Sequence, residues 1–217
     1  MIKRPFEQWL SEDVEIEFGI NQLNSLQSLA KWLEVQSNMP LSDAVETLRN
    51  SLLDNVTTWN EDELKMLFIA PFLIHFGFNN PPHYRIFTQR LFTLTTPTVE
   101  ASGKIEWLIA LGKQTPKKPF FFLQEYKPEK NSGNDPLGQL LIAMVDVQTL
   151  NENPTKPLYG CYIIGRFWFF VVLEDKQYGV SRAYDATQID DLTAMVEILQ
   201  KIKINIHKEL GLELPKF

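Results

Sequence analysis

The stretch FFFLQEYK, residues 120–127, decides the fold that we expect for this sequence. It is apolar at its start and charged at its end, which is typical of a β-strand that leaves a buried core. Alternate side chains of a strand share one face, so Glu125 and Lys127 point the same way and Tyr126 points towards a packing layer. A carboxylate and an ammonium that emerge together suit a metal site, because the carboxylate binds a hard divalent cation and the ammonium lies near the attacking water.

A second strand supplies another carboxylate. KIEWLIAL, residues 104–111, follows Gly103, and the polar turn GKQTPKKP separates it from residues 120–127. Antiparallel pairing of the two segments brings the start of the first beside the end of the second. Glu106 then lies opposite Glu125 and Lys127, so the spacing predicts two carboxylates and one lysine in a single cluster. The competing interpretation is a cross-strand ion pair at the rim of a sheet, and these residues alone favour neither.

The rest of the chain predicts helices around a mixed sheet. A helix that starts at the N-cap Asn60 and stops at Gly77 should be kinked or interrupted at Pro71. A helix at 136–150 separates strand 120–127 from a pair of strands that divides at Gly165 and Arg166, and this strand–helix–strand step implies a mixed sheet covered by helices. Periodicity predicts further helices at 21–35, 42–53 and 189–207, and strands at 84–94 and 180–184. We therefore expect an α/β fold with a helical extension over residues 1–58, packed on a core domain over 59–217.

Composition narrows the class of protein. The 217 residues have a net charge of −6 and are 44% hydrophobic, which indicates a globular chain of one main domain. The longest apolar stretch, 167–173, is too short to span a membrane, and no secretion signal is visible, so we expect a cytoplasmic protein. The acidic whole argues against strong non-specific binding of nucleic acid. Six lysines against three glutamates between residues 104 and 130 nevertheless form either a solvated face or a local basic groove.

Other residues with reactive or aromatic side chains favour packing over chemistry. Cys161 lies in an apolar strand and is interpreted as a small buried hydrophobe, and a single cysteine excludes an internal disulfide framework. Trp168 and the phenylalanines beside it are interpreted as core. Arg166 stays open between a turn charge and a phosphate contact.

The order of these charged residues resembles the PD-(D/E)XK nuclease superfamily, over the stretch from about Asn60 to Tyr184. NEDELKMLFIAPFLIHFGF is similar to the first core helix, KIEWLIA to the strand with the first metal ligand, FFLQEYK to the strand with the second ligand and the lysine, and DPLGQLLIAM to the helix that follows. The resemblance implies a restriction-endonuclease-like core. This sequence departs from the family twice: Glu106 stands where the family usually has aspartate, and Ala143 stands where some members have a tyrosine four residues after Gln139.

The resemblance also implies a nuclease that hydrolyses phosphodiester bonds with Mg²⁺ or Mn²⁺. The implied metal ligands are Glu106, Glu125 and the main-chain carbonyl of Tyr126. Lys127 would orient the attacking water or stabilise the developing charge, and Gln139 would orient Lys127 or the water. Glu61, with Glu63 as the alternative, would act from the outer coordination shell. The implied phosphate contacts are Lys113, Lys117, Lys118, Lys130 and Arg166.

The expected partner is nucleic acid, with DNA favoured over RNA, and no membrane. A homodimer or a larger restriction or defence assembly stays open. The alternative is a catalytically inactive nuclease-like module that binds nucleic acid or protein. In that case the carboxylates form structural ion pairs, and the acidic N-terminal region, with a net charge of −8 over residues 1–64, docks a partner.

Overall fold

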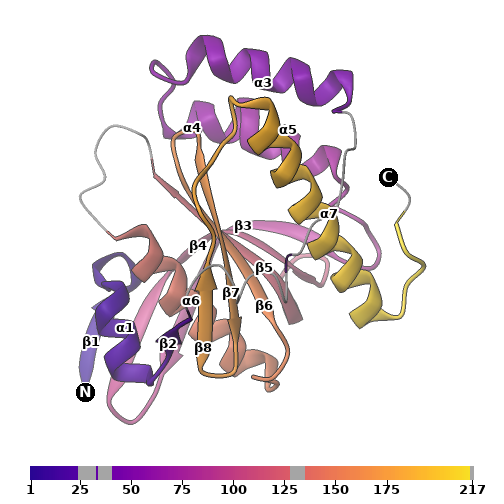
Figure 1. The fold of residues 1–217 in the computed structure, drawn as a ribbon. Coiled ribbons are helices and arrows are strands. Elements are labelled where there is room, and N and C mark those ends of the chain that lie inside the picture. The colour runs from indigo at the N-terminus through magenta and orange to yellow at the C-terminus, as the bar shows by residue number, and fades with distance from the viewer. Residues whose placement is uncertain (24–32, 34–40, 128–134, 216–217) are drawn as a thin grey trace.

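The computed structural model describes residues 1–23, 33, 41–127 and 135–215, and in them a nine-stranded mixed sheet lies between two layers of helices (Figure 1). The predicted α/β class is confirmed. The strands are β1 (Ile2–Pro5), β2 (Asn21–Gln22), β3 (Arg85–Thr95), β4 (Val99–Leu111), β5 (Lys117–Lys127), β6 (Leu158–Ile164), β7 (Phe167–Glu174), β8 (Gln177–Val180) and β9 (Tyr184–Asp185). The helices are η1 (Phe6–Gln8), α1 (Ser11–Phe18), α3 (Asp43–Asn55), α4 (Glu61–Leu64), η2 (Lys65–Ile69), α5 (Ala70–His75), α6 (Pro136–Asn151) and α7 (Ile189–Leu210).

The two strands on which the expected site depends form the predicted antiparallel hairpin. β4 pairs with β5 from Trp107 opposite Gln124 to Leu111 opposite Lys117, and β3 runs antiparallel along the other edge of β4. β6 then pairs parallel with β5, so β5, α6 and β6 form the expected strand–helix–strand unit. Asp135 begins α6 by accepting a hydrogen bond from the backbone N–H of Gly138, and Pro136 occupies the first turn, where no N–H is required.

The N-terminal residues belong to the sheet, which a purely helical extension does not anticipate. β1 pairs parallel with β4 over Val99–Ser102, and because β3 occupies the opposite edge of β4 there, β1 and β5 share one edge. η1 and α1 then pack against α6, and β2 becomes the last strand of the sheet beside β8. The expectation of a helical extension over residues 1–58 is therefore wrong for residues 2–5 and 21–22, which form strands of the sheet.

Two cores hold the helices to the sheet. One contains α3, α4, α5 and α7 against one face, and the other contains η1, α1 and α6 against the opposite face (Figure 1). Asn60 caps α4 as predicted. The α-helix is interrupted before Pro71 by the π-helix η2, in which the N–H of Ala70 donates to the carbonyl of Lys65. Pro71 has no N–H to continue an α-helical ladder, so the interruption falls next to it.

Other sequence expectations were displaced by tertiary contacts. The helix expected at 21–35 begins instead with strand β2, and most of its residues lie outside the described part of the chain. The strand expected at 104–111 is longer than predicted, because β4 continues through Gly103 to Val99. A Cβ atom on Gly103 would come within 2.5 Å of Phe6, so this glycine marks a close approach of Phe6 to the strand and not a strand boundary. The strand expected at 180–184 is divided between β8 and β9.

No described helix has both the length and the apolar character to span a membrane.

The buried carboxyl group of Asp146 in α6 should make stability depend on pH. It is 2% exposed, its Oδ2 has no hydrogen-bond partner among the described residues, and burial raises its pKa to about 7. Because this pKa exceeds the value of about 3.9 in an unfolded chain, the folded protein binds the proton more tightly between pH 4 and 7. The free energy of unfolding should therefore fall as pH rises through that window, by on the order of 3–4 kcal/mol.

The variant Asp146→Asn isolates this effect, since every other titrating group stays in place. Urea unfolding at pH 5 and pH 8 should show that the variant becomes more stable than the wild type as the pH rises. Equal pH slopes in the two proteins would contradict an isolated buried carboxyl group.

Candidate active site

The two predicted carboxylates lie where β4 and β5 stop pairing. The last pair of the ladder is Trp107 opposite Gln124, and Glu106 and Glu125 are the next residues on the two strands. If the ladder continued it would place Glu106 opposite Glu125, and like charges directly opposite each other destabilise a sheet. The strands separate instead. On the same edge of β4, β1 pairs only as far as Ser102, so a fork opens between β1 and β5 at Glu106.

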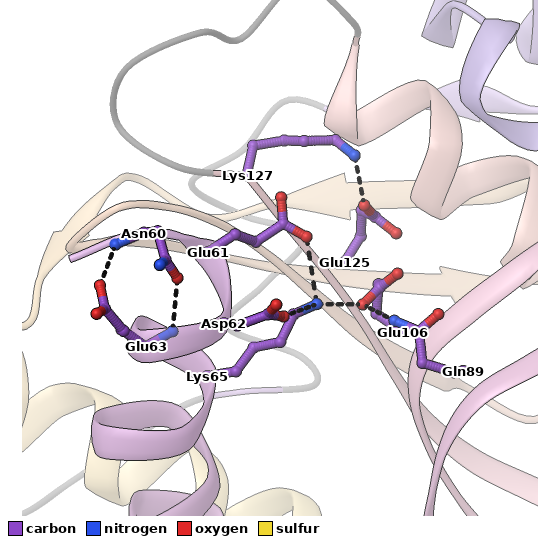
Figure 2. A network of polar contacts seen from close by, with 9 residues as sticks. All are labelled: Asn60, Glu61, Asp62, Glu63, Lys65, Gln89, Glu106, Glu125 and Lys127. Atoms are coloured by element: carbon purple, nitrogen blue, oxygen red, sulfur yellow. Dashed lines mark hydrogen bonds and ion pairs between the residues drawn. The ribbon is translucent and has the colours of Figure 1, made fainter.

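Glu125 and Lys127 form a largely buried ion pair at the end of β5. Lys127 Nζ lies 3.0 Å from Glu125 Oε1, and the Glu125 side chain is only 5% exposed. The pKa of Glu125 is raised to about 7, chiefly by burial and with smaller contributions from the charges of Glu106 and Glu61, which together outweigh the lowering effect of the Lys127 ammonium. The carboxylates of Glu61, Glu106 and Glu125 therefore lie near enough to one another for their charges to interact, as Figure 2 shows.

Glu106 is held by a lysine and a glutamine that sequence reasoning missed. Lys65 Nζ lies 2.9 Å from Glu106 Oε2, and Gln89 donates to the same oxygen over 2.5 Å (Figure 2). Gln89 has a φ of 55°, which is unusual for a side-chain-bearing residue and interrupts the β3–β4 ladder opposite Glu106. Ile105 and Leu108, three residues apart, both pack in the α6-side core, so the alternation of β4 also breaks at Glu106. Irregularities of this kind re-aim a side chain beside a site.

The Lys65 ammonium sits at the centre of the network. Besides Glu106, it lies 3.2 Å from Glu61 Oε1 and 3.7 Å from Asp62 Oδ1, and it is 4.0 Å from the centroid of the Tyr126 ring. Burial lowers the pKa of Lys65, but the hydrogen bonds and charges of Glu106 and Glu61 outweigh this and leave the pKa above its ordinary value. Lys65 therefore stays protonated. Tyr126 is fully buried, as the strand pattern predicts.

The structure distinguishes the two acids that the sequence offers from the first core helix. Glu63 accepts a hydrogen bond from the Asn60 N–H and thereby closes a capping box at the start of α4. Glu61 is free of that duty and faces Lys65 and the cluster (Figure 2). Glu61 is thus the residue that the fold brings to the site.

Gln139 lies in the first turns of α6 but makes no hydrogen bond to the cluster among the described residues. It is 8% exposed, and its Oε1 has no partner there. Gln124, which immediately precedes Glu125, is 1% exposed with both amide atoms unpaired in the described part of the chain. Unpaired buried amides are costly, so the buried side chains of Gln124 and Gln139 are polar groups that packing alone does not explain.

The expected phosphate contacts are mostly elsewhere. Lys113, Lys117 and Lys118 lie at the turn of the β4–β5 hairpin. Glu125 follows Lys118 by seven residues along β5, which in an extended strand is a separation of roughly 23 Å. They do not flank the carboxylates, because an antiparallel hairpin puts its turn at the end opposite to the open ends of its strands. Lys130 lies outside the described residues.

Arg166 lies at the same end of the sheet as Glu125 and Lys127. The N–H of Gly165 donates to the carbonyl of Lys127 over 2.9 Å, which brings the β6–β7 turn beside the end of β5. Arg166 is paired there with Asp185 at 3.2 Å, and its side chain is about one-third exposed. It is both a turn charge and a cation at the same end of the sheet as Lys127.

A pocket of about 220 Å³ opens beside the cluster. Its lining includes Lys65, Glu106, Gln89 and Asp62, but neither Glu125 nor Lys127. Two other hollows, of about 240 and 450 Å³, share Lys156 and Tyr159 at the opposite end of β5 and β6. No three-carboxylate network like that in Figure 2 lines either of those two hollows among the described residues.

The donors of the site fit a hard divalent cation in kind. Mg²⁺ is commonly held by one or two carboxylates together with water and substrate phosphates, and Glu106 and Glu125 supply two. No group of three or more His, Cys, Asp or Glu within the described ranges is arranged to hold a metal ion. Each of the two carboxylates is instead paired with a lysine, Glu106 with Lys65 and Glu125 with Lys127.

Part of what was missed had a signal in the sequence. Lys65 follows Glu61 by four residues on a helix, the spacing of an intrahelical ion pair. Gln89 had none, because its role depends on a positive φ within a strand.

In comparisons with known proteins, no family model matches the chain, and no curated protein matches it significantly.

Proposed function

We propose that this protein is a metal-dependent nuclease that hydrolyses phosphodiester bonds, with DNA as the first substrate to test and Mg²⁺ or Mn²⁺ as the cofactor. The observation that supports the proposal most is the position of Glu106, Glu125 and Lys127 at the point where β4 and β5 separate. A restriction-endonuclease-like core belongs to the same proposal. Its support is the order β3–β4–β5–α6–β6 and the acidic start of α4 beside the strand ends.

The proposed chemistry assigns a task to each side chain. Glu106, Glu125 and the Tyr126 carbonyl would hold the cation, which when bound supplies an activated water and neutralises charge on the phosphate. Lys127 orients that water or stabilises the negative charge that develops on the phosphate. Glu61, which pairs with Lys65 at 3.2 Å, would order water in the outer coordination shell, and the largely buried amide of Gln139 near the start of α6 would orient Lys127 or the water. Arg166 provides a phosphate contact at the same edge.

Metal binding should stabilise the folded protein. At a Mn²⁺ concentration of a hundred times Kd, binding adds about 2.7 kcal/mol, which corresponds to a rise in Tm of about 5–10 °C for a domain of this size. Glu106→Gln and Glu125→Gln should each abolish the rise, because each removes a charged ligand while preserving size. Glu152→Gln is the matched control, since Glu152 pairs with Lys118 at the far end of the hairpin. A rise that survives in both site variants would refute the assignment.

A second candidate function is a non-catalytic binding module. The specific observation in its favour is that both carboxylates already have a lysine partner in the structure. On this view the cluster is a structural network, and nucleic acid or protein binds without cleavage. Incubation with single- and double-stranded DNA and with RNA, in Mn²⁺ and in a chelator, separates the two functions. Binding without metal-dependent cleavage favours the module.

A further inference from the structure

The position of Lys65 has a consequence for how the site would take up a cation. Its ammonium lies 2.9, 3.2 and 3.7 Å from oxygens of Glu106, Glu61 and Asp62, so one positive charge faces three negative charges. The Lys65 and Glu106 side chains are each 15% exposed, so bulk water screens their interaction only partly. A local excess of negative charge therefore remains even with the lysine in place.

The Lys65 side chain also has space into which it can move. Both Lys65 and Glu106 line the pocket of about 220 Å³, so the Lys65 side chain borders open space. The aliphatic stem rises from the first residue of the π-helix η2, and long lysine side chains can move the charged head while the stem stays packed. Asp62 is 86% exposed at the mouth of the network, so it offers an alternative partner near solvent.

We propose that Lys65 is an internal counter-cation that competes with a divalent metal for Glu106, so that metal binding displaces the ammonium towards the pocket. The inference rests on the metal site of the proposed function. Its physical basis is that an ammonium and a divalent cation repel each other strongly at the few ångströms that sharing one carboxylate allows. Lys65 thus lowers the affinity for metal and stabilises the metal-free site.

The test is a calorimetric titration of the full-length protein with Mn²⁺ and with Mg²⁺. Lys65→Met removes the charge and keeps the length of the stem, so it should bind Mn²⁺ at least about tenfold more tightly than the wild type. Lys113→Met is the matched control: it makes the same change in net charge at an exposed residue of the hairpin turn, and its affinity should stay within about twofold of the wild type. Without metal, Lys65→Met should have the lower Tm, and its gain on adding Mn²⁺ should be the larger.

A second variant guards against misfolding. Lys65→Gln is neutral but can still donate to Glu106, so it should fold and should also gain affinity. Unchanged or weaker binding by both folded Lys65 variants, with binding by the wild type and its loss in Glu106→Gln, overturns the competition while leaving the proposed metal site intact. Absence of Mn²⁺ binding in the wild type and in both folded Lys65 variants overturns the metal site itself, and the competition with it.

Discussion

Replacement of Lys127 by methionine should lower the rate of metal-dependent cleavage by about 10²–10⁴-fold, the usual contribution of a positioned proton-transfer or charge-stabilising group. The variant also removes the partner of Glu125, whose side chain is 5% exposed. An unpaired buried carboxylate is costly, and breaking such a pair typically destabilises a protein by about 3–5 kcal/mol. Single-turnover cleavage of labelled DNA and urea unfolding measure the two effects separately.

The stability effect should depend on pH. Without the ammonium, the pKa of Glu125 rises above its value of about 7, so the carboxyl group is neutral in the folded variant at pH 6 and its loss of a partner is largely relieved. The destabilisation should therefore be small at pH 6 and approach its full size above pH 8. Lys118→Met is the control, because it breaks an exposed pair with Glu152 and should cost no more than about 1 kcal/mol at either pH. Wild-type cleavage rates in Lys127→Met would rule out a role for this lysine in the reaction.

Replacement of Gly138 by alanine should destabilise the fold by about 2–3 kcal/mol and lower Tm by roughly 5–10 °C. Glycine to alanine within a helix normally stabilises, by up to about 1 kcal/mol, so the expected sign is reversed. The reason is that a Cβ atom on Gly138 would lie 2.3 Å from the carbonyl oxygen of Trp9 and 2.6 Å from the backbone nitrogen of Ser11. Both are backbone atoms, so the start of α1 would have to move off α6.

The comparison with Gly19→Ala makes this prediction specific. A Cβ on Gly19 meets nothing within 4 Å, but its φ of 63° is left-handed, so alanine should cost about 1 kcal/mol there. Urea unfolding followed by circular dichroism should rank Gly138→Ala as the more damaging variant. The opposite ranking would show that the contact between α1 and α6 yields easily.

Local patterns predicted the parts of this fold that local forces decide. The hairpin of β4 and β5, the cap Asn60 of α4, and the break near Pro71 follow from periodicity, capping and the missing proline N–H. Such features depend on residues a few positions apart, so one sequence suffices to infer them.

The parts that failed depend on contacts between distant segments. Gly103 looked like the end of a strand, but the ring of Phe6 makes it an interior position of β4. Lys65 reaches Glu106 only because the strands separate and β4 loses its alternation there, which no spacing rule foresees. The lysines of the hairpin turn were assigned to the site by nearness in sequence, although the turn lies at one end of the hairpin and the open ends of its strands lie at the other.

The pairing of β1 and β2 with late strands bears on how the chain folds as it is synthesised. Residues 2–5 are synthesised long before their partner in β4, which begins at Val99, and residues 21–22 are synthesised long before β8 near Gln177. Closing loops of this length is slow, because the entropy is lost before the distant contacts reward it. The segments that form β1 and β2 therefore stay without their strand partners until β4 and β8 have been synthesised.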